Sequence, residues 1–507
     1  VTRLSSEAPL REIRGSWVVG SPQSIENWTG IGTAFAIELR KKLNIPVGII
    51  QSTWGGTRIE AWMSQRALQS NELLKPQFDQ YLSNLQGFDQ RLERWQNEAN
   101  VWDAANEKRD PGNAGFDKGW HKRDYDDSDW NEVSLPVPWE QEELREVDGA
   151  SWYRFRFDMP YEWLEKPLRL ELGFVGTDDL VYINGLKLGG TQGKYKQRSY
   201  FIGNGLLRED KNVIAIRVWN RSGEGGILGP NLRLGTTSGG SYMDLSTTWK
   251  TKNELVIEPP TDLSKRRPER PMGPGDRNAP AGPFSGMIAP LIPFGIKGIL
   301  WYQGEGNIGQ SELYESAFPS LIKDWRQRWN RPDLPFYFVQ LPGYKRANEP
   351  DKALWAEMRQ AQLRGLDQPY TAMVVSIDQT DPDTIHPIRK YEIGRRLANL
   401  ALAQTYQRNV YAFAPYASSV RVYGNKARVN FQNLYGSLKS PTSELKGFEV
   451  LGDEGWVPAT AELSGTGVWV NSPGFSPKAV RYAWSDSPEA ELFNAAGNPI
   501  SPFWLTP

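Results

Sequence analysis

The segment TDPDTIHP, residues 380–387, holds one of only two histidines in a chain of 507 residues. Asp383 precedes His386 by three residues, and Pro387 helps to stiffen the loop. An aspartate at this spacing in a turn can direct its carboxylate onto imidazole Nδ1, which fixes the tautomer while Nε2 acts as a base on a serine. The same pattern also fits a structural histidine, or a calcium-binding turn formed by Asp381 and Asp383.

A second stretch that could do chemistry is STWGGT, residues 52–57. Adjacent glycines let backbone N–H groups approach a ligand closely, and an oxyanion hole needs such donors. Gly55 and Gly56 are therefore candidate oxyanion donors. A plain tight turn is the alternative interpretation of the same two residues.

The third stretch is WYQGEGN, residues 301–307, which ends the hydrophobic run GIKGIL. It gathers three polar side chains, those of Gln303, Glu305 and Asn307. The amide of a glutamine or asparagine can donate to a developing oxyanion. Polar residues at the end of a buried strand can also simply cap the helix that follows.

The elements around these loops alternate between apolar β-branched runs and segments of helical periodicity, which predicts a parallel sheet. In such sheets functional loops follow the strands, and each of the three stretches does so. We expect helices over 29–44, 311–329, 353–366 and 390–406, and strands over 45–51, 335–342 and 371–378. A charged helical stretch from 61 to about 106 is assigned no chemistry.

Between these α/β parts the pattern changes to short alternating runs, which predict antiparallel strands over 152–160, 168–174, 179–190 and 212–220, with Asn184-Gly185 as a hairpin turn. Beyond 409 the pattern is again that of strands. The expected fold class is α/β, interrupted by a β-sandwich and followed by a small all-β domain. The predicted boundaries are 1–111 and 246–408 for the α/β domain, 112–245 for the sandwich and 409–507 for the last domain.

Composition restricts the possible functions. The chain has 59 basic and 60 acidic residues and no dense basic run, so nucleic acid is an unexpected partner. It has no cysteine, and its second histidine, His121, lies within the sandwich, so neither a disulfide nor a zinc site is expected. No run of 18 apolar residues occurs, so we expect no membrane span. Aromatic residues make up 12% of the chain; most should fill cores, and some could contact sugar.

Taken together, the segments STWGGTRIEAWMS, GMIAPLIPFGIKGILWYQGEGN and DPDTIHPIRKYEIGRRLA resemble the sialate O-acetylesterase-like branch of the SGNH-hydrolase superfamily. PFYFVQLPGY and WAEMRQAQ look like the same family, and the resemblance covers roughly 16–64 and 284–406. The inserted sandwich resembles the sugar-binding jelly roll of family 2 glycosidases. The resemblance implies a three-layer SGNH esterase domain that deacetylates carbohydrates, with no cofactor.

By this resemblance His386 is the general base, Asp383 orients it, and Gly55, Gly56 and Gln303 donate to the oxyanion. Substrate binding is assigned to three further loop residues, Trp54, Glu305 and Asn307. The implied mechanism is two-step acyl transfer that releases acetate and a free sugar hydroxyl.

One departure from the family is serious, because its nucleophilic serine lies in a Gly-Gln-Ser-Asn-Met motif that this sequence lacks. Ser52 is the only serine in a matching loop, and it is a poor substitute. A separate N-terminal fragment that carries the serine is one explanation, and an inactive protein is another. Two alternative functions therefore stay open: a catalytically silent carbohydrate-binding protein, and a glycosidase using two carboxylates such as Glu305 and Asp383.

The expected substrate is an acetylated oligo- or polysaccharide, with a plant polysaccharide such as xyloglucan or xylan favoured over sialic acid. This preference follows from the inserted domain and the 21 tryptophans. On the resemblance alone we expect a periplasmic or secreted protein.

Overall fold

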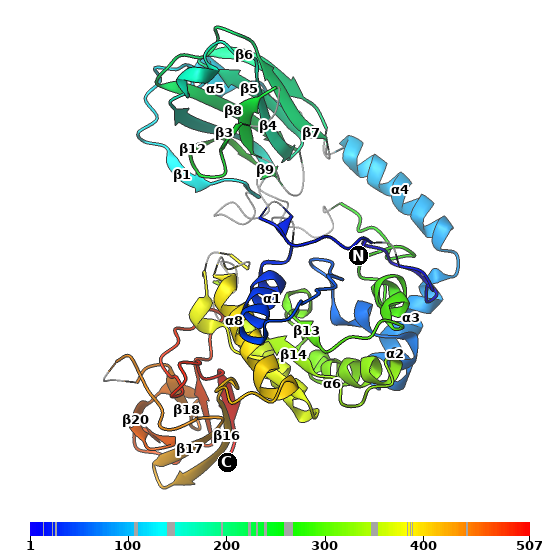
Figure 1. The fold of residues 1–507 in the computed structure, drawn as a ribbon, viewed down its shortest axis with the longest axis vertical. Coiled ribbons are helices and arrows are strands. Elements are labelled where there is room, and N and C mark those ends of the chain that lie inside the picture. The colour runs from blue at the N-terminus through cyan, green and yellow to red at the C-terminus, as the bar shows by residue number, and fades with distance from the viewer. Residues whose placement is uncertain are drawn as a thin grey trace. The chain divides into compact units, whose positions relative to one another are not determined.

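The computed structural model describes residues 1–13, 15–22, 24–25, 28–105, 110–138, 148–193, 196–221, 225–229, 232–237, 241–257, 267–345, 353–382, 384–385, 387, 389–442 and 445–507. These residues form two compact units, shown as a ribbon in Figure 1. The first unit joins residues 1–91 to 271–507, and the second comprises residues 92–270. The second unit is therefore an insertion in the sequence of the first.

A parallel sheet lies at the centre of the first unit. Its order is β13 (Ile299–Trp301), β14 (Phe336–Val339) and β15 (Thr371–Val374). Because side chains alternate along a strand, Tyr337 and Val339 join one hydrophobic cluster, with α1 (Gly30–Leu43) and α8 (Lys390–Leu400). Phe336 and Phe338 join another, with α6 (Ser311–Arg328) and α7 (Leu354–Gln362). The mixed helix and sheet composition predicted from the sequence is confirmed.

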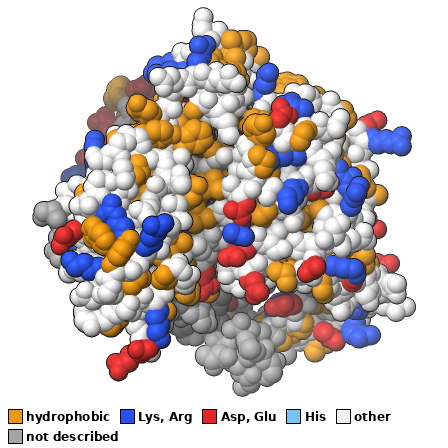
Figure 2. Space-filling view, turned by 90° about the horizontal axis from the view of Figure 1, so that it is seen from below, with side chains coloured by type: hydrophobic (Ala, Val, Ile, Leu, Met, Phe, Trp, Pro, Cys, Tyr) orange, Lys and Arg blue, Asp and Glu red, His pale blue; other side chains and the backbone are white. Residues whose placement is uncertain are grey.

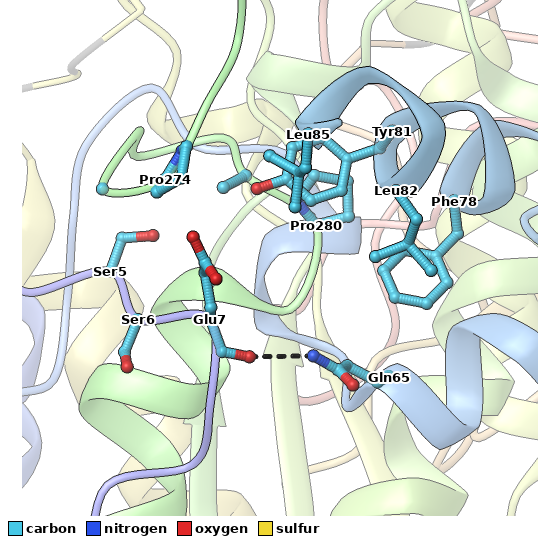
Figure 3. Close-up of a pocket in the computed structure, with 13 residues that line it drawn as sticks. Ser5, Ser6, Glu7, Gln65, Phe78, Tyr81, Leu82, Leu85, Pro274 and Pro280 are labelled. Atoms are coloured by element: carbon cyan, nitrogen blue, oxygen red, sulfur yellow. Dashed lines mark hydrogen bonds between the residues drawn. The ribbon is translucent and has the colours of Figure 1, made fainter. Parts of the chain in front are cut away.

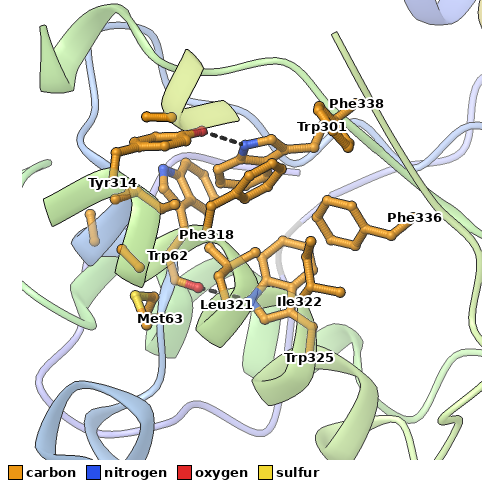
Figure 4. Close-up of a cluster of buried hydrophobic side chains, with 14 of the residues drawn as sticks. Trp62, Met63, Trp301, Tyr314, Phe318, Leu321, Ile322, Trp325, Phe336 and Phe338 are labelled. Atoms are coloured by element: carbon orange, nitrogen blue, oxygen red, sulfur yellow. Dashed lines mark hydrogen bonds between the residues drawn. The ribbon is translucent and has the colours of Figure 1, made fainter. Parts of the chain in front are cut away.

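The larger cluster is rich in aromatic rings (Figure 4). Trp301 of β13 is packed edge-on against Trp62 and Trp325, with ring centroids 6.5 Å and 5.8 Å away. The indole N–H of Trp325 donates to the Trp62 carbonyl at 2.8 Å, and that of Trp301 lies 3.3 Å from the Tyr314 hydroxyl. The polar edges of these buried rings are thus satisfied while their faces fill the core.

The first unit also contains shorter helices. They are η2 (Ile59–Trp62), α2 (Gln65–Ser70), α3 (Lys75–Leu85), η6 (Phe284–Ile288), η7 (Ala289–Leu291), η8 (Glu305–Asn307), η9 (Leu363–Asp367), η10 (Ile377–Gln379) and η11 (Ala401–Thr405). Helix α4 (Phe88–Ala105) runs across the boundary between the two units. None of the helices within the described ranges is long and apolar enough to cross a membrane.

Two six-stranded sheets that share one hydrophobic cluster make up most of the second unit, which is therefore a β-sandwich. One sheet has the order β1-β12-β3-β8-β5-β6, and the other contains β11-β10-β4-β9-β2 with β7 paired to β4. The strands are β1 (Asn131–Ser134), β2 (Val137–Pro138), β3 (Asp148–Phe157), β4 (Leu168–Val175), β5 (Asp178–Ile183), β6 (Leu186–Thr191), β7 (Gln197–Ile202), β8 (Asn212–Asn220), β9 (Gly226–Gly229), β10 (Arg233–Thr236), β11 (Tyr242–Asp244) and β12 (Thr248–Ile257). Two short helices, α5 (Ala114–Asp117) and η4 (Tyr161–Trp163), accompany them.

A buried ion pair lies beside this sandwich. Arg217 of β8 donates to Glu254 of β12 at 2.7 Å and to Asp110 at 2.6 Å, and the Trp152 indole also donates to Glu254. Burial raises the pKa of Glu254, but the hydrogen bonds from Arg217 and Trp152 outweigh burial and hold that pKa below its ordinary value.

The last part of the chain forms two four-stranded antiparallel sheets around a hydrophobic cluster of its own. Their orders are β16-β17-β21-β20 and β19-β18-β22-β23. The strands are β16 (Tyr416–Tyr423), β17 (Lys426–Gln432), β18 (Phe448–Leu451), β19 (Trp456–Pro458), β20 (Thr460–Ser464), β21 (Gly467–Asn471), β22 (Ala479–Tyr482) and β23 (Phe503–Leu505).

On the face drawn in Figure 2, charges of both signs are intermixed with hydrophobic side chains.

The units change at 91/92 and 270/271, not at the predicted 111/112 and 245/246. Strand β12, which the sequence analysis assigns to the α/β domain, pairs with β1 and β3 and so completes a sandwich sheet. Composition does not reveal this pairing, because strand pairing is a long-range property.

The strand predicted over 45–51 is absent, and these residues have no regular structure. A strand exists only through hydrogen bonds to a neighbour, and no described segment pairs with this run. The run also stays partly exposed, with Ile45 at 41%.

Candidate active site

Two of the loops predicted to carry chemistry, residues 52–57 and 301–307, are joined by hydrogen bonds. The Gln303 side chain donates from Nε2 to the Thr57 carbonyl at 3.1 Å, and the Ile59 N–H donates to Asn307 Oδ1 at 2.9 Å. Asn307 also donates from Nδ2 to Glu60 at 2.9 Å. The loop after β13 and the Gly-Gly loop therefore form one polar network.

Glycine permits this close approach. A Cβ built on Gly306 would lie 2.6 Å from the Thr57 carbonyl oxygen and 3.3 Å from the Arg58 nitrogen. Any other side chain would push the two loops apart, so the position requires glycine for packing and not for a special φ.

A hydroxyl holds the Gly-Gly turn in shape. Thr57 donates from Oγ1 to the Trp54 carbonyl at 2.7 Å and accepts from the Trp62 indole at 2.8 Å. Gly56 has a φ of 69°, which favours glycine. No hydrogen bond between described residues engages the N–H of Gly55 or Gly56. Both donors are therefore free, as the predicted oxyanion role requires.

Two other predicted roles do not fit the geometry. Gln303 gives one amide hydrogen to Thr57 and the other to Asn307 Oδ1 at 2.9 Å, so it has none left for an oxyanion. Asn307 is 0% exposed and bonded through both its amide atoms, so it does not reach a substrate. Both amides serve to join the loops.

Ser52 is also engaged elsewhere. Its hydroxyl donates to the Met287 carbonyl at 3.2 Å, and no described basic side chain is hydrogen-bonded to it. The structure thus gives Ser52 a structural contact and no sign of activation as a nucleophile.

Glu305 and its neighbours form the most perturbed part of the site. Burial raises the pKa of Glu305, although its own N–H and that of Gly304 favour the carboxylate. Burial, followed by the charge of Glu305, raises the pKa of Tyr302. The Tyr302 hydroxyl and Gln303 Oε1 are buried without a hydrogen-bond partner. Strongly shifted pKa values cluster at functional sites, and buried polar atoms without a partner are rare in native proteins.

Asp383 and His386, the predicted acid and base, lie outside the described residues. Their neighbours are held firmly. Arg396 of α8 pairs with Asp378 through both guanidinium ends, and the Gly343 N–H donates to Thr380 Oγ1 at 2.8 Å. The Lys345 N–H donates to the Pro382 carbonyl at 2.7 Å.

The stretch 380–387 also contributes to the core shared by the other two stretches. Ile385, the residue before His386, packs against the large hydrophobic cluster, as do Trp54 and Tyr302. Trp54, predicted to contact substrate, is partly buried there. Each of the three stretches thus contributes a side chain to the same hydrophobic cluster.

Two cavities are lined partly by α3, and Tyr81 lines both. The smaller, of about 150 Å³, is drawn in Figure 3, where the Glu7 carbonyl accepts from the Gln65 amide at 2.8 Å. The larger, of about 440 Å³, is bordered by Arg58, Glu60 and Arg91. Burial, followed by the charges of Glu7 and Asp276, raises the pKa of Tyr81 to about 12. The described residues contain no cluster of metal-ligating side chains.

Two family models match separate segments of the chain. Residues 288–403 match the family model described as carbohydrate esterase, sialic acid-specific acetylesterase. Residues 98–231 match that of the sugar binding domain of glycosyl hydrolases family 2. Both resemblances drawn from the sequence are confirmed: the chain is related to the carbohydrate esterases through one segment and to a sugar-binding domain through the other.

Individual relatives agree with this class. Human sialate O-acetylesterase is 29% identical over 231 residues, which are 40% of this chain and 44% of that protein. The mouse sialate O-acetylesterase is 30% identical over 231 residues, covering 40% and 42%. A crystal structure of a carbohydrate acetylesterase from Xanthomonas citri is 22% identical and covers 67% of this chain and 96% of that one, with a TM-score of 0.43. The chain spans less than half the length of the human and mouse proteins that it matches.

Proposed function

We propose that this protein is a carbohydrate O-acetylesterase that removes acetyl groups from an acetylated oligo- or polysaccharide. One observation carries the proposal: the loop with Gly55 and Gly56 is bonded to the loop after β13, while both glycines keep their N–H groups free. Free backbone donors held on a rigid turn are what a tetrahedral intermediate requires. Asp378, which accepts from Arg396 of α8, precedes the proposed base His386 and its orienting partner Asp383 in the sequence.

The proposed chemistry is serine acyl transfer on a three-layer SGNH domain. A serine oxygen attacks the acetyl carbonyl as His386 takes its proton; the sugar oxygen then leaves with that proton, and water hydrolyses the acetyl-enzyme. The N–H groups of Gly55 and Gly56 stabilise the oxyanion in both steps, and no metal is required. We further propose that the inserted sandwich is a jelly roll that binds sugar.

The serine itself is proposed to come from a segment outside residues 1–507. A strand edge without a partner and exposed apolar side chains support this. Within the described ranges, strand β13 pairs on one side only, and the run 45–51 pairs with no strand. Trp17, which lies against Gly48, is 69% exposed, and Val19 is 89% exposed. Such surface is normally covered by another segment.

For the substrate we propose a plant polysaccharide such as xyloglucan or xylan in preference to sialic acid, and for the compartment the periplasm or the exterior. The preference for a polysaccharide is supported by the inserted domain, whose family model describes sugar binding. An acetylated sialoglycoprotein is the competing substrate to include in any assay.

The test combines acetate release with labelling of the nucleophile. Purified protein is incubated with acetylated xyloglucan oligosaccharides or an O-acetylated sialoglycoprotein, and in parallel with a fluorophosphonate that labels activated serines. We expect acetate release, loss of release in His386→Ala, and a label on a peptide outside residues 1–507. A label on Ser52 would refute the proposed origin of the serine. No label and no acetate from either substrate would refute the esterase and favour a silent glycan-binding protein, and glycan cleavage that persists in His386→Ala would favour a two-carboxylate glycosidase.

A further inference from the structure

The last domain has a row of polar and aromatic side chains on the outer face of one sheet. Strands β18, β22 and β23 point Phe448, Tyr482 and Phe503 into the core. The alternate positions face outward, and the strand register places Glu449 opposite Arg481 and Arg481 opposite Trp504. This outward row therefore crosses three neighbouring strands.

Three tryptophans meet around this row. The ring of Trp504 is perpendicular to that of Trp456, with centroids 5.5 Å apart and an angle of 87°. It stands at 85° to that of Trp484, also at 5.5 Å. Trp504 is 42% exposed, and the other two rings are partly exposed. We call these three rings, together with Arg481 and Glu449, the tryptophan platform.

A neutralised ion pair completes the platform. Arg481 donates to both oxygens of Glu449, at 2.7 Å and 2.9 Å, and its guanidinium lies 4.3 Å from the centre of the Trp456 ring. The two charges cancel, yet the pair still offers donor and acceptor atoms in a fixed plane. The platform thus combines flat apolar faces with hydrogen-bonding groups and no net charge.

These features match the chemistry of an uncharged sugar. A pyranose ring has an apolar C–H face that can stack on indole and a rim of hydroxyls that can bond to a guanidinium or a carboxylate. An anionic ligand would find the arginine already paired, so charge complementarity favours a neutral one. We propose that the tryptophan platform binds uncharged sugar residues of a polysaccharide.

The platform is fixed to the α/β part of the same unit. The backbone N–H of Trp504 donates to the side-chain oxygen of Gln360 of α7 at 3.2 Å. The side-chain amide of Gln360 donates back to the backbone carbonyl of Trp504 at 3.4 Å. Just after Trp484, the carbonyls of Ser485 and Asp486 accept from Arg359 of α7. A glycan bound to the platform is therefore held on a surface rigidly connected to the esterase region.

A short path of contacts leads from the platform towards the stretch 380–387. Three residues after Trp484, Ser487 lies so close to Gly343 that a Cβ on the glycine would meet its Cα at 3.0 Å. The Gly343 N–H in turn donates to Thr380 Oγ1, six residues before His386. The idea that the bound glycan is the one deacetylated rests on the proposed function, whereas sugar binding by the platform does not.

The binding test uses xyloglucan oligosaccharides from which acetyl groups have been removed, so that no esterase reaction is needed. Calorimetric titration of the full chain gives the dissociation constant of the wild type. The Trp504→Ala variant should raise this constant on the order of 10-fold or more, because one stacking face is lost. Trp504→Phe should retain part of the affinity. The outward side chain of Trp504 lets the variant fold, which the thermal midpoint and near-ultraviolet circular dichroism will verify.

Trp469→Ala provides a matched control in the same domain. Trp469 lies in β21 of the other sheet, also with an arginine over its ring at 5.4 Å and an aromatic neighbour at 5.5 Å, but without the corner of three tryptophans. The Trp469→Ala variant should bind the deacetylated xyloglucan oligosaccharides with the affinity of the wild type. Three results would each overturn the proposal: no binding of a neutral oligosaccharide by the wild type, equal affinity in Trp504→Ala, or tighter binding of polygalacturonate than of the neutral sugar. Hydrolysis of 4-nitrophenyl acetate, measured in parallel, reports on the proposed esterase separately.

Discussion

Replacing Gly306 with alanine tests whether close packing between two loops holds the candidate site together. The added Cβ would lie 2.6 Å from the Thr57 carbonyl oxygen, and real Cβ contacts are essentially never closer than 3.0 Å, so the loops must separate by at least 0.4 Å. The Gln303–Thr57 hydrogen bond, now 3.1 Å, would then approach the limit of a useful bond. Overpacking costs about 1–3 kcal/mol and the lost bond about 1 kcal/mol, so we expect Gly306→Ala to destabilise the protein by ~2–4 kcal/mol.

Urea unfolding measures this change as a lower midpoint with an unchanged slope. Gly295→Ala is the matched control, because a Cβ there meets nothing within 4 Å; it should stay within about 0.5 kcal/mol of the wild type. Acetate release should also fall in Gly306→Ala, since a displaced oxyanion turn misaligns its donors. If the two alanine variants unfold at the same urea concentration, the reasoning from contact distances is wrong.

Three further changes probe other parts of the molecule. Glu254→Gln should destabilise the sandwich by about 1–3 kcal/mol at pH 7. Because the folded pKa of Glu254 lies below its unfolded value, the wild type should lose this advantage as the pH falls below about 4.5, and thermal midpoints of both proteins measured from pH 7 to 3 should converge. Arg359→Lys should lower the free energy of unfolding by about 2–4 kcal/mol, because a single ammonium group cannot reach all three carbonyls to which the buried guanidinium donates. A urea midpoint equal to that of the wild type would contradict this. Thr57→Val removes the hydroxyl that accepts from Trp62 and should cost about 1–3 kcal/mol and lower acetate release, whereas unchanged kinetics would show that this hydroxyl does not support the turn.

The local parts of the fold are well predicted from the sequence. The run 212–220 is a strand with those bounds, and Asn184 and Gly185 have positive φ values of 48° and 89°, as the predicted hairpin turn requires. Helix α6 begins at Ser311 and ends within one residue of the predicted position. Periodicity and turn chemistry are local signals, so they suffice for such elements.

Properties that depend on distant partners are predicted less well. The run 45–51 has the composition of a strand but no neighbour to pair with, and β12 joins a sheet whose other strands lie up to 120 residues earlier in the chain. The sequence does not predict that Thr57 supports the Gly-Gly turn, because its two hydrogen bonds are visible only in the folded structure. A threonine directly after two glycines is the one local signal that could have indicated it.

The division of roles within QGEGN follows from burial. Gln303 and Asn307 are 8% and 0% exposed, and amide N–H groups at that depth need partners inside the protein, so both side chains donate within the network that joins the loops. Gly55 and Gly56 lie at the surface of the turn, where their N–H groups need no internal partner. The oxyanion donors of this site are therefore expected to be backbone groups, and the side-chain amides keep those groups in position. Replacing Gln303 should consequently act through the geometry of the turn, lowering stability and acetate release together.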